Sequence, residues 1–321
     1  MTLPVVLELE RPVVELERKI EELTDRASGT SEDMAEIARL ERKAEALRAK
    51  VFGSLSPWQR VQLARHPARP RPHALVPQVI SDFVELRGDR FSGDDPGILA
   101  GLGFLERRAV AVLAHGRGRP AGHGRRWTGP PDAGGLRKAR RLVDLAQRFS
   151  LPLVTFVDVA DDERRSGLRA ARTAEPLAEL LAALCGLETP GVSVITGEAY
   201  GAAAMALVAL DRVVMLEHAV CAPLPPERCA IREHGGPDRA ESIAASLRLT
   251  ADDVRAVGLC DEVITEPSGG AHRSADQTAE ILRAALRRQV TALESVDAED
   301  RLEARRTRLE TLGHLVAVAR P

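Results

Sequence analysis

The sequence has almost no net charge, few cysteines and no long apolar run, and each shortage excludes a class of function. The 321 residues carry a formal charge of -2, from 45 basic and 47 acidic residues, so the chain lacks the positive field that draws proteins to nucleic acids or acidic membranes. Its cysteines, at positions 185, 221, 229 and 260, form no CxxC pair, which argues against a zinc ribbon or a disulfide framework.

The apolar segments are also too short for a membrane protein. No apolar run approaches the roughly 20 residues that a membrane helix needs. Glutamates interrupt the N-terminal stretch MTLPVVLELERPVVELE, where a secretory signal would have a basic and then an apolar region. We therefore expect a cytoplasmic protein that binds neither nucleic acid nor membrane.

The first 55 residues are expected to form a helical hairpin. One apolar stripe at helical spacing precedes the turn ASGTSED and a second follows it. Within the turn, Thr30 and Asp33 match a capping box. The stripes consist of Val13, Leu16, Ile20 and Leu23, and of Ile37, Leu40, Ala44, Leu47 and Val51. The pattern leaves open whether the hairpin packs on its own chain or holds a partner subunit.

A change of composition predicts a domain boundary near residue 55. The sequence PWQRVQLARHPARPRPHALV, which follows Phe52 and Gly53, is rich in proline and arginine, and this composition indicates little regular structure. The expected division is a hairpin over residues 1–55 and a larger domain over residues 56–321.

The larger domain has the pattern of an α/β core. Strands separated by helices of about 10 to 15 residues indicate β-α crossovers. The expected strands are ILAGLGFLE (98–106), AVAVLAHG (109–116), PLVTFVDV (152–159), GVSVITG (191–197) and RVVMLEH (212–218). Helices are expected over 135–149, 170–184 and 201–210, and a long helical tail runs from 275 to about 315.

Ligands of such sheets gather at the carboxyl ends of the strands, and two strand ends here carry charge. The stretch AHGRGR places His115, Arg117 and Arg119 in a loop with glycine, which fits either anion contact or a solvated basic turn. The strand ending at Asp158 leads into a charge run that includes Asp161. Because the run lacks the ligand spacing of an oxygen-only metal site, we expect solvated surface there and no metal.

A third strand end has almost no side chain. Residues 197–207 read GEAYGAAAMAL. Small residues at a strand-to-helix turn let the backbone approach a ligand, and the free amides of the first helical turn stabilise an oxyanion. Close packing of an alanine-rich helix would give the same pattern.

In their order along the chain, these segments resemble the alpha subunit of the bacterial acetyl-CoA carboxylase carboxyltransferase. The resemblance covers nearly the whole chain. It rests on LELERPVVELERKIEELT, PWQRVQLARHPARP, ELRGDRFSGDDPGILAGLGFLERR, AHGRGR, LRKARRLVDLAQRFSLPLVTFVD, VSVITGE and PSGGAHR (267–273). It implies a crotonase-like α/β fold of repeated β-β-α units, with an N-terminal helical hairpin and a long C-terminal helix.

The resemblance also implies a reaction and partners. The family transfers a carboxyl group from carboxybiotin, held on a biotin carboxyl carrier protein, to acetyl-CoA or a related acyl-CoA, giving malonyl-CoA for fatty acid synthesis. A beta subunit that carries the zinc would complete a two-alpha, two-beta assembly. No cofactor is expected to be bound covalently to this chain, and no metal is expected in it.

Site residues are carried over from the family's motifs. The backbone amides of Ala199, Tyr200 and Gly201 would form the oxyanion turn. Contacts to carboxybiotin or coenzyme A would come from His115, Arg117, Arg119, Ala160, Asp161, Gly167 and Glu227.

The chain departs from the family at several of these positions. A loop close to TPGAYPG is replaced by residues 159–165 (VADDERR), and a turn close to GEGGSGGALA reads GEAYGAAAMA. Alanine and tyrosine would be strained at positive φ, and the Tyr200 ring would add bulk. These departures keep two alternatives open: an active alpha subunit, or a weakened or inactive paralogue with an assembly or regulatory role. A stand-alone crotonase-like hydratase or hydrolase fits the N-terminal hairpin less well.

Overall fold

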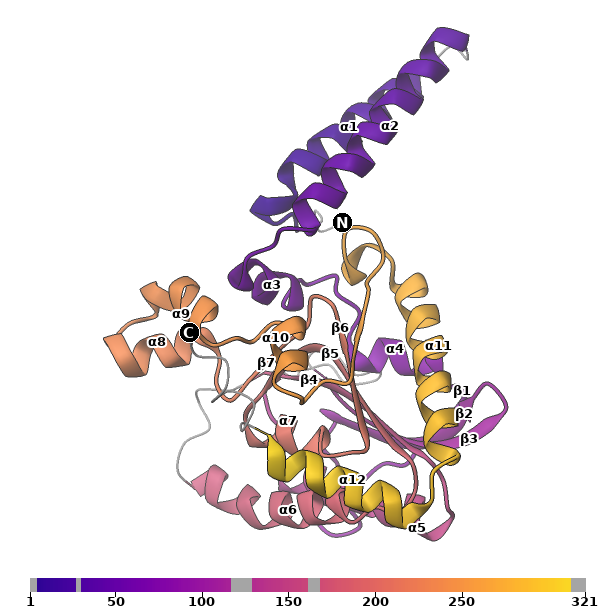
Figure 1. The fold of residues 1–321 in the computed structure, drawn as a ribbon, viewed down its shortest axis with the longest axis vertical. Helices are drawn as coiled ribbons and strands as arrows, with labels where there is room; N and C mark the ends of the chain where they lie inside the picture. Colours follow the sequence, from indigo (N-terminus) through magenta and orange to yellow (C-terminus); the bar gives the residue numbers. More distant parts are fainter. Residues whose placement is uncertain (1–4, 27–29, 117–128, 161–167, 313–321) are drawn as a thin grey trace.

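A mixed eight-stranded sheet forms the centre of the protein, and a helical hairpin projects from it (Figure 1). In a computed structural model, the structure describes residues 5–26, 30–116, 129–160 and 168–312. The sheet order is β1-β2-β3-β4-β5-β6-β8, and β7 pairs with β5. The strands are β1 (Ser81–Glu85), β2 (Ile98–Leu105), β3 (Arg108–Gly116), β4 (Leu153–Val159), β5 (Gly191–Tyr200), β6 (Arg212–Leu216), β7 (Val220–Ala222) and β8 (Glu262–Ile264).

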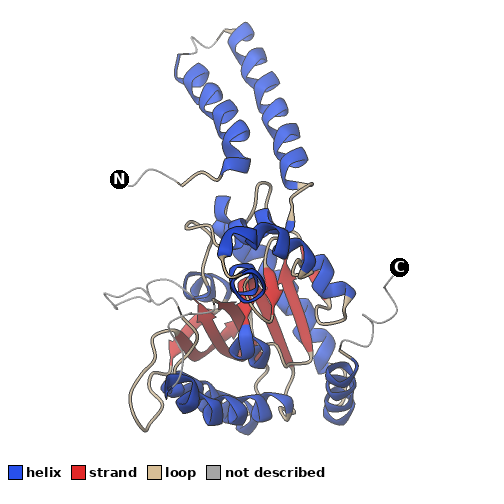
Figure 2. Cartoon of the chain, turned by 90° about the vertical axis from the view of Figure 1, so that its left-hand side faces the viewer, coloured by secondary structure: helices blue, strands red, loops and turns tan. Residues whose placement is uncertain are grey.

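The pairings β1–β2 and β2–β3 are antiparallel. All the other pairings between these strands, beginning with β3–β4, are parallel. Residues 153–159 and 191–200 are buried throughout, as expected for parallel strands covered on both faces. Helices α4 (Pro72–Val79) and α11 (Ala275–Glu294) pack together on one side of the sheet. On the other side lie α5 (Ala133–Arg148), α6 (Leu168–Cys185) and α7 (Gly201–Leu207) (Figure 2). The predicted α/β core is confirmed, and β2-β3-α5 is one β-β-α unit.

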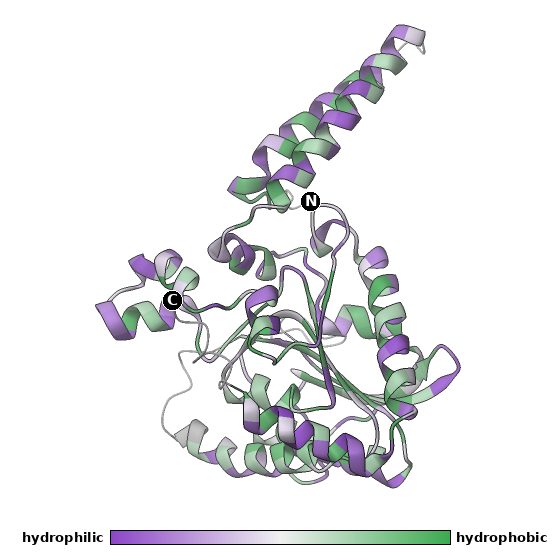
Figure 3. Cartoon of the chain, viewed as in Figure 1, coloured by the Kyte–Doolittle hydropathy of each residue, from purple (hydrophilic) through white to green (hydrophobic). Residues whose placement is uncertain are grey.

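The hairpin prediction is also confirmed. It consists of α1 (Arg11–Arg26) and α2 (Ser31–Phe52), preceded by the short 3-10 helix η1 (Glu8–Glu10). Thr30 caps α2 by accepting a hydrogen bond from the Asp33 amide at 3.2 Å. Hydrophilic and hydrophobic residues alternate along both helices (Figure 3), and most of the predicted stripe residues are only partly buried.

The expectation of little regular structure after residue 55 is wrong. Two helices occupy that region, α3 (Pro57–Ala64) and α4. Each begins with a proline at its first position, where the missing amide hydrogen costs nothing and the fixed φ suits a helix. Ser56 and Gln59 add a complete capping box to α3.

The single long C-terminal helix is also wrong, because two helices replace it: α11 and α12 (Ala298–Thr311). Asp297 has extended backbone angles (φ -62°, ψ 152°) and breaks the helical path. The Arg301 guanidinium then donates to the carbonyl oxygens of Leu293 and Val296 at the end of α11. This satisfies groups that a helix end leaves unpaired.

The remaining elements connect the sheet to its surface layers. They are α8 (Pro226–His234), η2 (Pro237–Arg239), α9 (Ala240–Ser246), α10 (Ala251–Ala256) and η3 (Ala271–Arg273). The predicted helix over 201–210 ends earlier, at Leu207, and the strand over 212–218 ends at Leu216. No helix of the described residues is long and apolar enough to cross a membrane.

Candidate functional site

The carboxyl ends of β3, β4 and β5 lie side by side, as expected for strands that run in parallel. Gly116 is the register partner of Asp158, and Val159 is the partner of Ala199. Beyond β5, Ala199 also pairs with Cys221 of β7. The structure therefore brings all three predicted strand ends to one edge of the sheet.

Asp158 organises the junction between β4 and β5. Its Oδ1 accepts a hydrogen bond from the Glu198 amide at 2.9 Å. A Cβ at Gly197 would lie 2.3 Å from the same oxygen, so only glycine permits this approach. The close contact coincides with an irregularity in the β4–β5 register between Val157 and Val159.

The strand-to-helix turn is sharper than the sequence suggested. Ala199 and Tyr200 belong to β5, and α7 begins at Gly201. The positive φ falls on Gly201 (φ 76°), while Tyr200 has an extended conformation (φ -117°, ψ 144°). The expected strain at Ala199 and Tyr200 is therefore wrong, because neither residue has a positive φ.

The bulk of the Tyr200 ring, expected at this turn from the sequence, is packed in the interior. Its side chain is only 2% exposed and lies in an apolar cluster with Val61 of α3, Val220 of β7 and Leu249. The ring thus fills the space between the sheet edge and the layer formed by α3.

Arg65 joins two of the site elements. Its Nε donates to Oε1 of Glu198 at 2.6 Å, and its Nη1 and Nη2 donate to both carboxylate oxygens of Glu227, at 3.1 Å for Nη2. Glu227 lies in the first turn of α8. Burial raises the pKa of Glu227, but the hydrogen bond and charge of Arg65 outweigh it and hold that pKa below its ordinary value.

A second arginine fixes the end of β4. Arg71 Nη1 donates to Oδ2 of Asp158 at 2.8 Å, and its Nη2 donates to the carbonyl oxygens of Arg65 and His66. Sequence reasoning assigned no role to Arg65, Arg71 or Glu198. The sequence RHPARPR belongs to the segment predicted to have little regular structure. Its arginines are nevertheless a usable signal, because arginine suits fixed bidentate contacts to carboxylates.

The other predicted site residues are distributed as follows. His115 is fully buried near the end of β3, and Ala160 is half-buried just after β4. Arg117, Arg119, Asp161 and Gly167 lie outside the residues that the structure describes.

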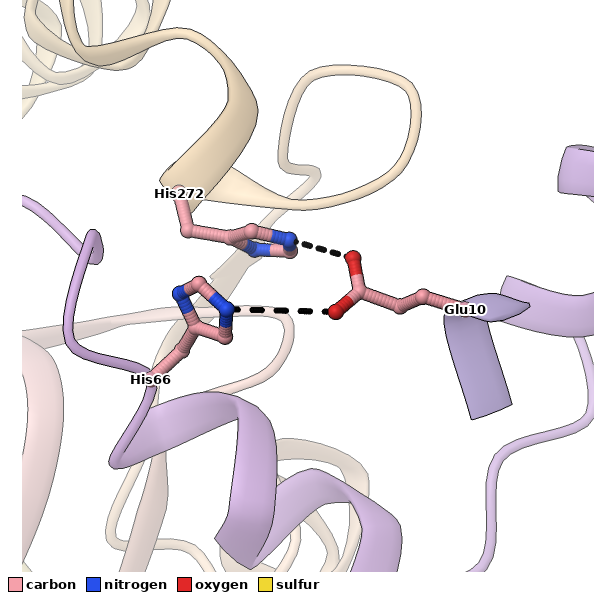
Figure 4. Close-up of side chains that lie close together, drawn as sticks. All are labelled: Glu10, His66 and His272. Carbon is pink, nitrogen blue, oxygen red and sulfur yellow. Dashed lines mark hydrogen bonds and ion pairs between the residues drawn. The ribbon is translucent and has the colours of Figure 1, made fainter. Parts of the chain in front are cut away.

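A second group of titratable residues lies at the base of the hairpin, away from the strand ends. Glu10 comes from η1, His272 from η3, and His66 from the segment just after α3. Each offers a ligand atom within 4.8 Å of the others (Figure 4). His272 Nε2 lies 2.8 Å from Glu10 Oε1, and Glu10 Oε2 accepts from the Leu7 amide at 3.0 Å.

The hydrogen bonds of His66 do not fit a metal ligand. Its Nδ1 accepts from the Ala68 amide at 3.2 Å, which places the proton on Nε2, and Nε2 lies 3.0 Å from the carbonyl oxygen of Val5. A metal needs an unprotonated nitrogen. The group therefore fits a polar junction between hairpin and body.

Comparison with known proteins agrees with the resemblance seen in the sequence. Residues 6–313 match the family model described as acetyl co-enzyme A carboxylase carboxyltransferase-like. The chain belongs to this family. A member from Geobacter metallireducens, named acetyl-coenzyme A carboxylase carboxyl transferase subunit alpha, is 39% identical over 300 residues, which cover 93% of this chain and 94% of the relative. A subunit of the same name from Vibrio cholerae is 38% identical over 96% of this chain and 98% of its own length.

Solved structures with a similar fold include other enzymes that act on coenzyme A thioesters or malonate. A Pseudomonas malonate decarboxylase hetero-tetramer in complex with coenzyme A matches with a TM-score of 0.57 and 16% identity, over 73% of this chain and 91% of that one. The beta subunit of geranyl-CoA carboxylase from P. aeruginosa matches with a TM-score of 0.51 and 15% identity, over 71% and 44%. At these identities the likeness concerns the fold, and it agrees with the carboxyltransferase-type fold expected for the family.

Proposed function

We propose that this chain is the alpha subunit of an acetyl-CoA or related acyl-CoA carboxyltransferase, which transfers a carboxyl group from carboxybiotin to the acyl-CoA. The observation that carries the proposal is the arrangement of the strand ends. In a chain that matches the family over residues 6–313, the ends of β3, β4 and β5 meet the start of α7 at one sheet edge.

The chemistry at this edge would depend mainly on the backbone. The enolate of the thioester and the ureido oxygen of biotin both gain negative charge during the transfer, and preorganised amides stabilise such charge. We assign this task to the segment Ala199–Gly201. His115, Ala160 and Glu227 are proposed to line the site, together with Arg117, Arg119, Asp161 and Gly167.

The proposal extends to the assembly. A beta subunit, a biotin carboxyl carrier protein and an acyl-CoA are the expected partners, in a two-alpha, two-beta complex that supplies malonyl-CoA for fatty acid synthesis in the cytoplasm. Carboxybiotin would arrive on its carrier, and zinc would be bound in the beta subunit. The hairpin, over residues 1–55, is proposed as a separate unit available to a partner chain.

Co-expression with the beta-type chain of the same genome tests the function directly. We expect a stable complex that forms malonyl-CoA from acetyl-CoA when a carboxylated biotin carrier is supplied, with each chain alone as control. Zinc measured in the complex should follow the beta chain. A stable complex whose turnover does not exceed that of the beta chain alone would refute the catalytic role and leave an assembly role.

A further inference from the structure

Two arginines connect three segments of the proposed site through side-chain contacts. Arg71 bonds to Asp158 at the end of β4, and Asp158 in turn accepts from the Glu198 amide of β5. Arg65 contacts the Glu198 side chain and the Glu227 carboxylate of α8. The backbone of Arg65 is itself held by Arg71 at 3.2 Å.

One planar group holds two carboxylates. The Arg65 guanidinium donates to the Glu198 carboxylate through Nε and to the Glu227 carboxylate through Nη1 and Nη2. Because the guanidinium is rigid, it fixes the position of each carboxylate relative to the other. Glu198 is 2% exposed at its side chain, whereas Arg65 and Glu227 are 31% and 27% exposed. Arg65 is therefore partly exposed while its Nε holds a buried carboxylate.

Glu198 and Glu227 stand at positions where placement affects the site. Glu198 directly precedes the Ala199–Gly201 segment, and Glu227 follows the N-terminal end of α8 by one residue. Burial alone would lower the pKa of Arg65, but its two carboxylate partners raise it above the ordinary value. The guanidinium thus remains a cation in this position at any pH at which the protein is folded.

We propose that Arg65 is a positioning residue for carboxyl transfer: it sets the spacing between the Ala199–Gly201 segment and the start of α8. This inference rests on the proposed function of that edge. Positioning matters because a displacement of about 1 Å at a reacting centre costs on the order of a hundredfold in rate. If Arg65 positions the amides that stabilise the transition state, a change at Arg65 lowers kcat more than it alters KM.

The diagnostic substitution is Arg65→Lys, which keeps the charge but loses the planar fork. Arg60→Lys is the matched control, because Arg60 lies in α3, the helix that ends just before Arg65, and the side-chain hydrogen bond that the structure gives it runs from Nη1 to the carbonyl oxygen of Glu217. In the assembled complex, we expect Arg65→Lys to lower kcat about tenfold with KM for the acyl-CoA changed less than about twofold. Arg60→Lys should match the wild type.

Amide hydrogen exchange gives a readout that does not depend on turnover. Peptides covering 197–203 and 225–230 should exchange about tenfold faster in Arg65→Lys at an unchanged thermal midpoint, as local opening without global unfolding requires. If Arg65→Lys does not fold, the double variant Arg65→Met with Glu198→Gln replaces it, since it leaves no buried carboxylate without its cation.

Different results would refute the proposed function and the positioning role of Arg65. A wild-type complex that shows no turnover refutes the proposed function. Hydrogen exchange then tests by itself whether Arg65 holds the two segments in place. Unchanged exchange at both peptides, or kcat losses that appear equally in Arg60→Lys, overturn the positioning role even when the wild type is active. Faster exchange at both peptides, confined to the Arg65 variants, supports it.

Discussion

At the scale of single residues, Gly201 carries the conformational demand of the proposed site. Its φ is 76°, and a Cβ there would meet nothing within 4 Å, so a side chain would be opposed by backbone strain alone. We expect Gly201→Ala to reduce the free energy of unfolding by about 1 kcal/mol, the usual cost of a left-handed alanine.

Gly236→Ala is the control for this prediction. Gly236 has an extended backbone (φ -158°, ψ 160°), and a Cβ added there would meet only an Asp238 oxygen, at 3.8 Å. Alanine fits such a conformation. The free energy of unfolding of Gly236→Ala, measured in urea, should therefore stay within about 0.5 kcal/mol of the wild-type value. Equal losses in the two variants would show that φ at Gly201 is not the cause.

The same residue explains how a glycine-poor turn keeps its shape. The family's glycines are replaced by alanine and tyrosine at positions 199 and 200, but the structure extends β5 through both. Extended backbone suits any residue, and the Tyr200 ring contributes to a core cluster with α3. Gly201 stands where the family's motif has serine, and it is the residue that takes the positive φ of the turn.

At the scale of elements, the sequence predicted strands and crossover helices well and the connecting segments poorly. The predicted strand at 98–106 forms β2, which is antiparallel to both of its neighbours. The apolar runs at 152–159 and 191–197 form the parallel strands β4 and β5, because a parallel sheet buries both faces and marks its strands with continuous apolar residues. The ends of these strands also located the candidate site. Short elements such as β7 and β8 carry too few residues for any period to show.

The proline- and arginine-rich segment shows why the remainder was missed. Two of its prolines, Pro57 and Pro72, stand at helix starts. Its charged residues pair with groups distant in sequence, as Arg69 does with Glu266 and the carbonyl oxygen of Thr196. Local propensity treats proline as a helix breaker, but at the first position of a helix proline is favourable. Contacts between residues more than a hundred positions apart leave no local pattern.

The start of α5 contains a carboxylate pair that gives a pH prediction. Asp132 caps α5 through Oδ1 and the Gly135 amide at 2.9 Å, and the Asp132 amide donates to Asp95 at 2.8 Å. Burial, followed by repulsion from Asp132, raises the pKa of Asp95 to about 6. Because the folded state then binds more protons than the unfolded state, this pair costs stability as the pH rises from about 4 to about 6.

Asp132→Asn should relieve the part of that cost that comes from repulsion, since asparagine also caps helices but carries no charge, while the part that comes from the burial of Asp95 stays. Relative to the wild type, the variant should gain about 1 kcal/mol of unfolding free energy between about pH 5 and about pH 7.5, measured by urea titration. A difference between the two proteins that does not vary with pH would contradict the assigned repulsion.

At the scale of the whole molecule, the hairpin is attached at its base and otherwise projects from the body (Figure 1). The base is held by an apolar cluster of Phe52, Leu55 and Leu63, and by Glu17, which accepts hydrogen bonds from Arg48 of α2 and Arg273 of η3 at 2.5 Å. The arrangement has features of both packings considered from the sequence: the base packs on its own chain, and the outer part leaves its stripes partly exposed.

The same segment that approaches the site also approaches the hairpin. Arg65 contacts the strand ends, while the next residue, His66, contacts Val5 and lies 3.9 Å from Glu10 Oε2. Adjacent residues thus connect the projecting hairpin to the proposed site.

Acidification should weaken this junction. Burial, followed by the neighbouring His272 and Arg71, lowers the pKa of His66, while Val5 and Glu10 oppose the shift. The unfolded state therefore binds a proton that the folded state does not, and stability falls as the pH drops below about 6.5. In His66→Asn the Asn Oδ1 can still accept the Ala68 amide, as in an Asx turn.

The expected result is a wild-type advantage over His66→Asn that is larger at about pH 7.5 than at about pH 5.5, measured as unfolding free energy. His234→Asn, at an exposed position in the last turn of α8, is the control for the loss of a histidine outside the junction. An advantage that stays constant would mean that folding does not lower the pKa of His66, and an advantage that grows on acidification would mean that folded His66 binds its proton more tightly than the unfolded chain does. The junction would then be an ion pair with Glu10, and acid would tighten the hairpin onto the body.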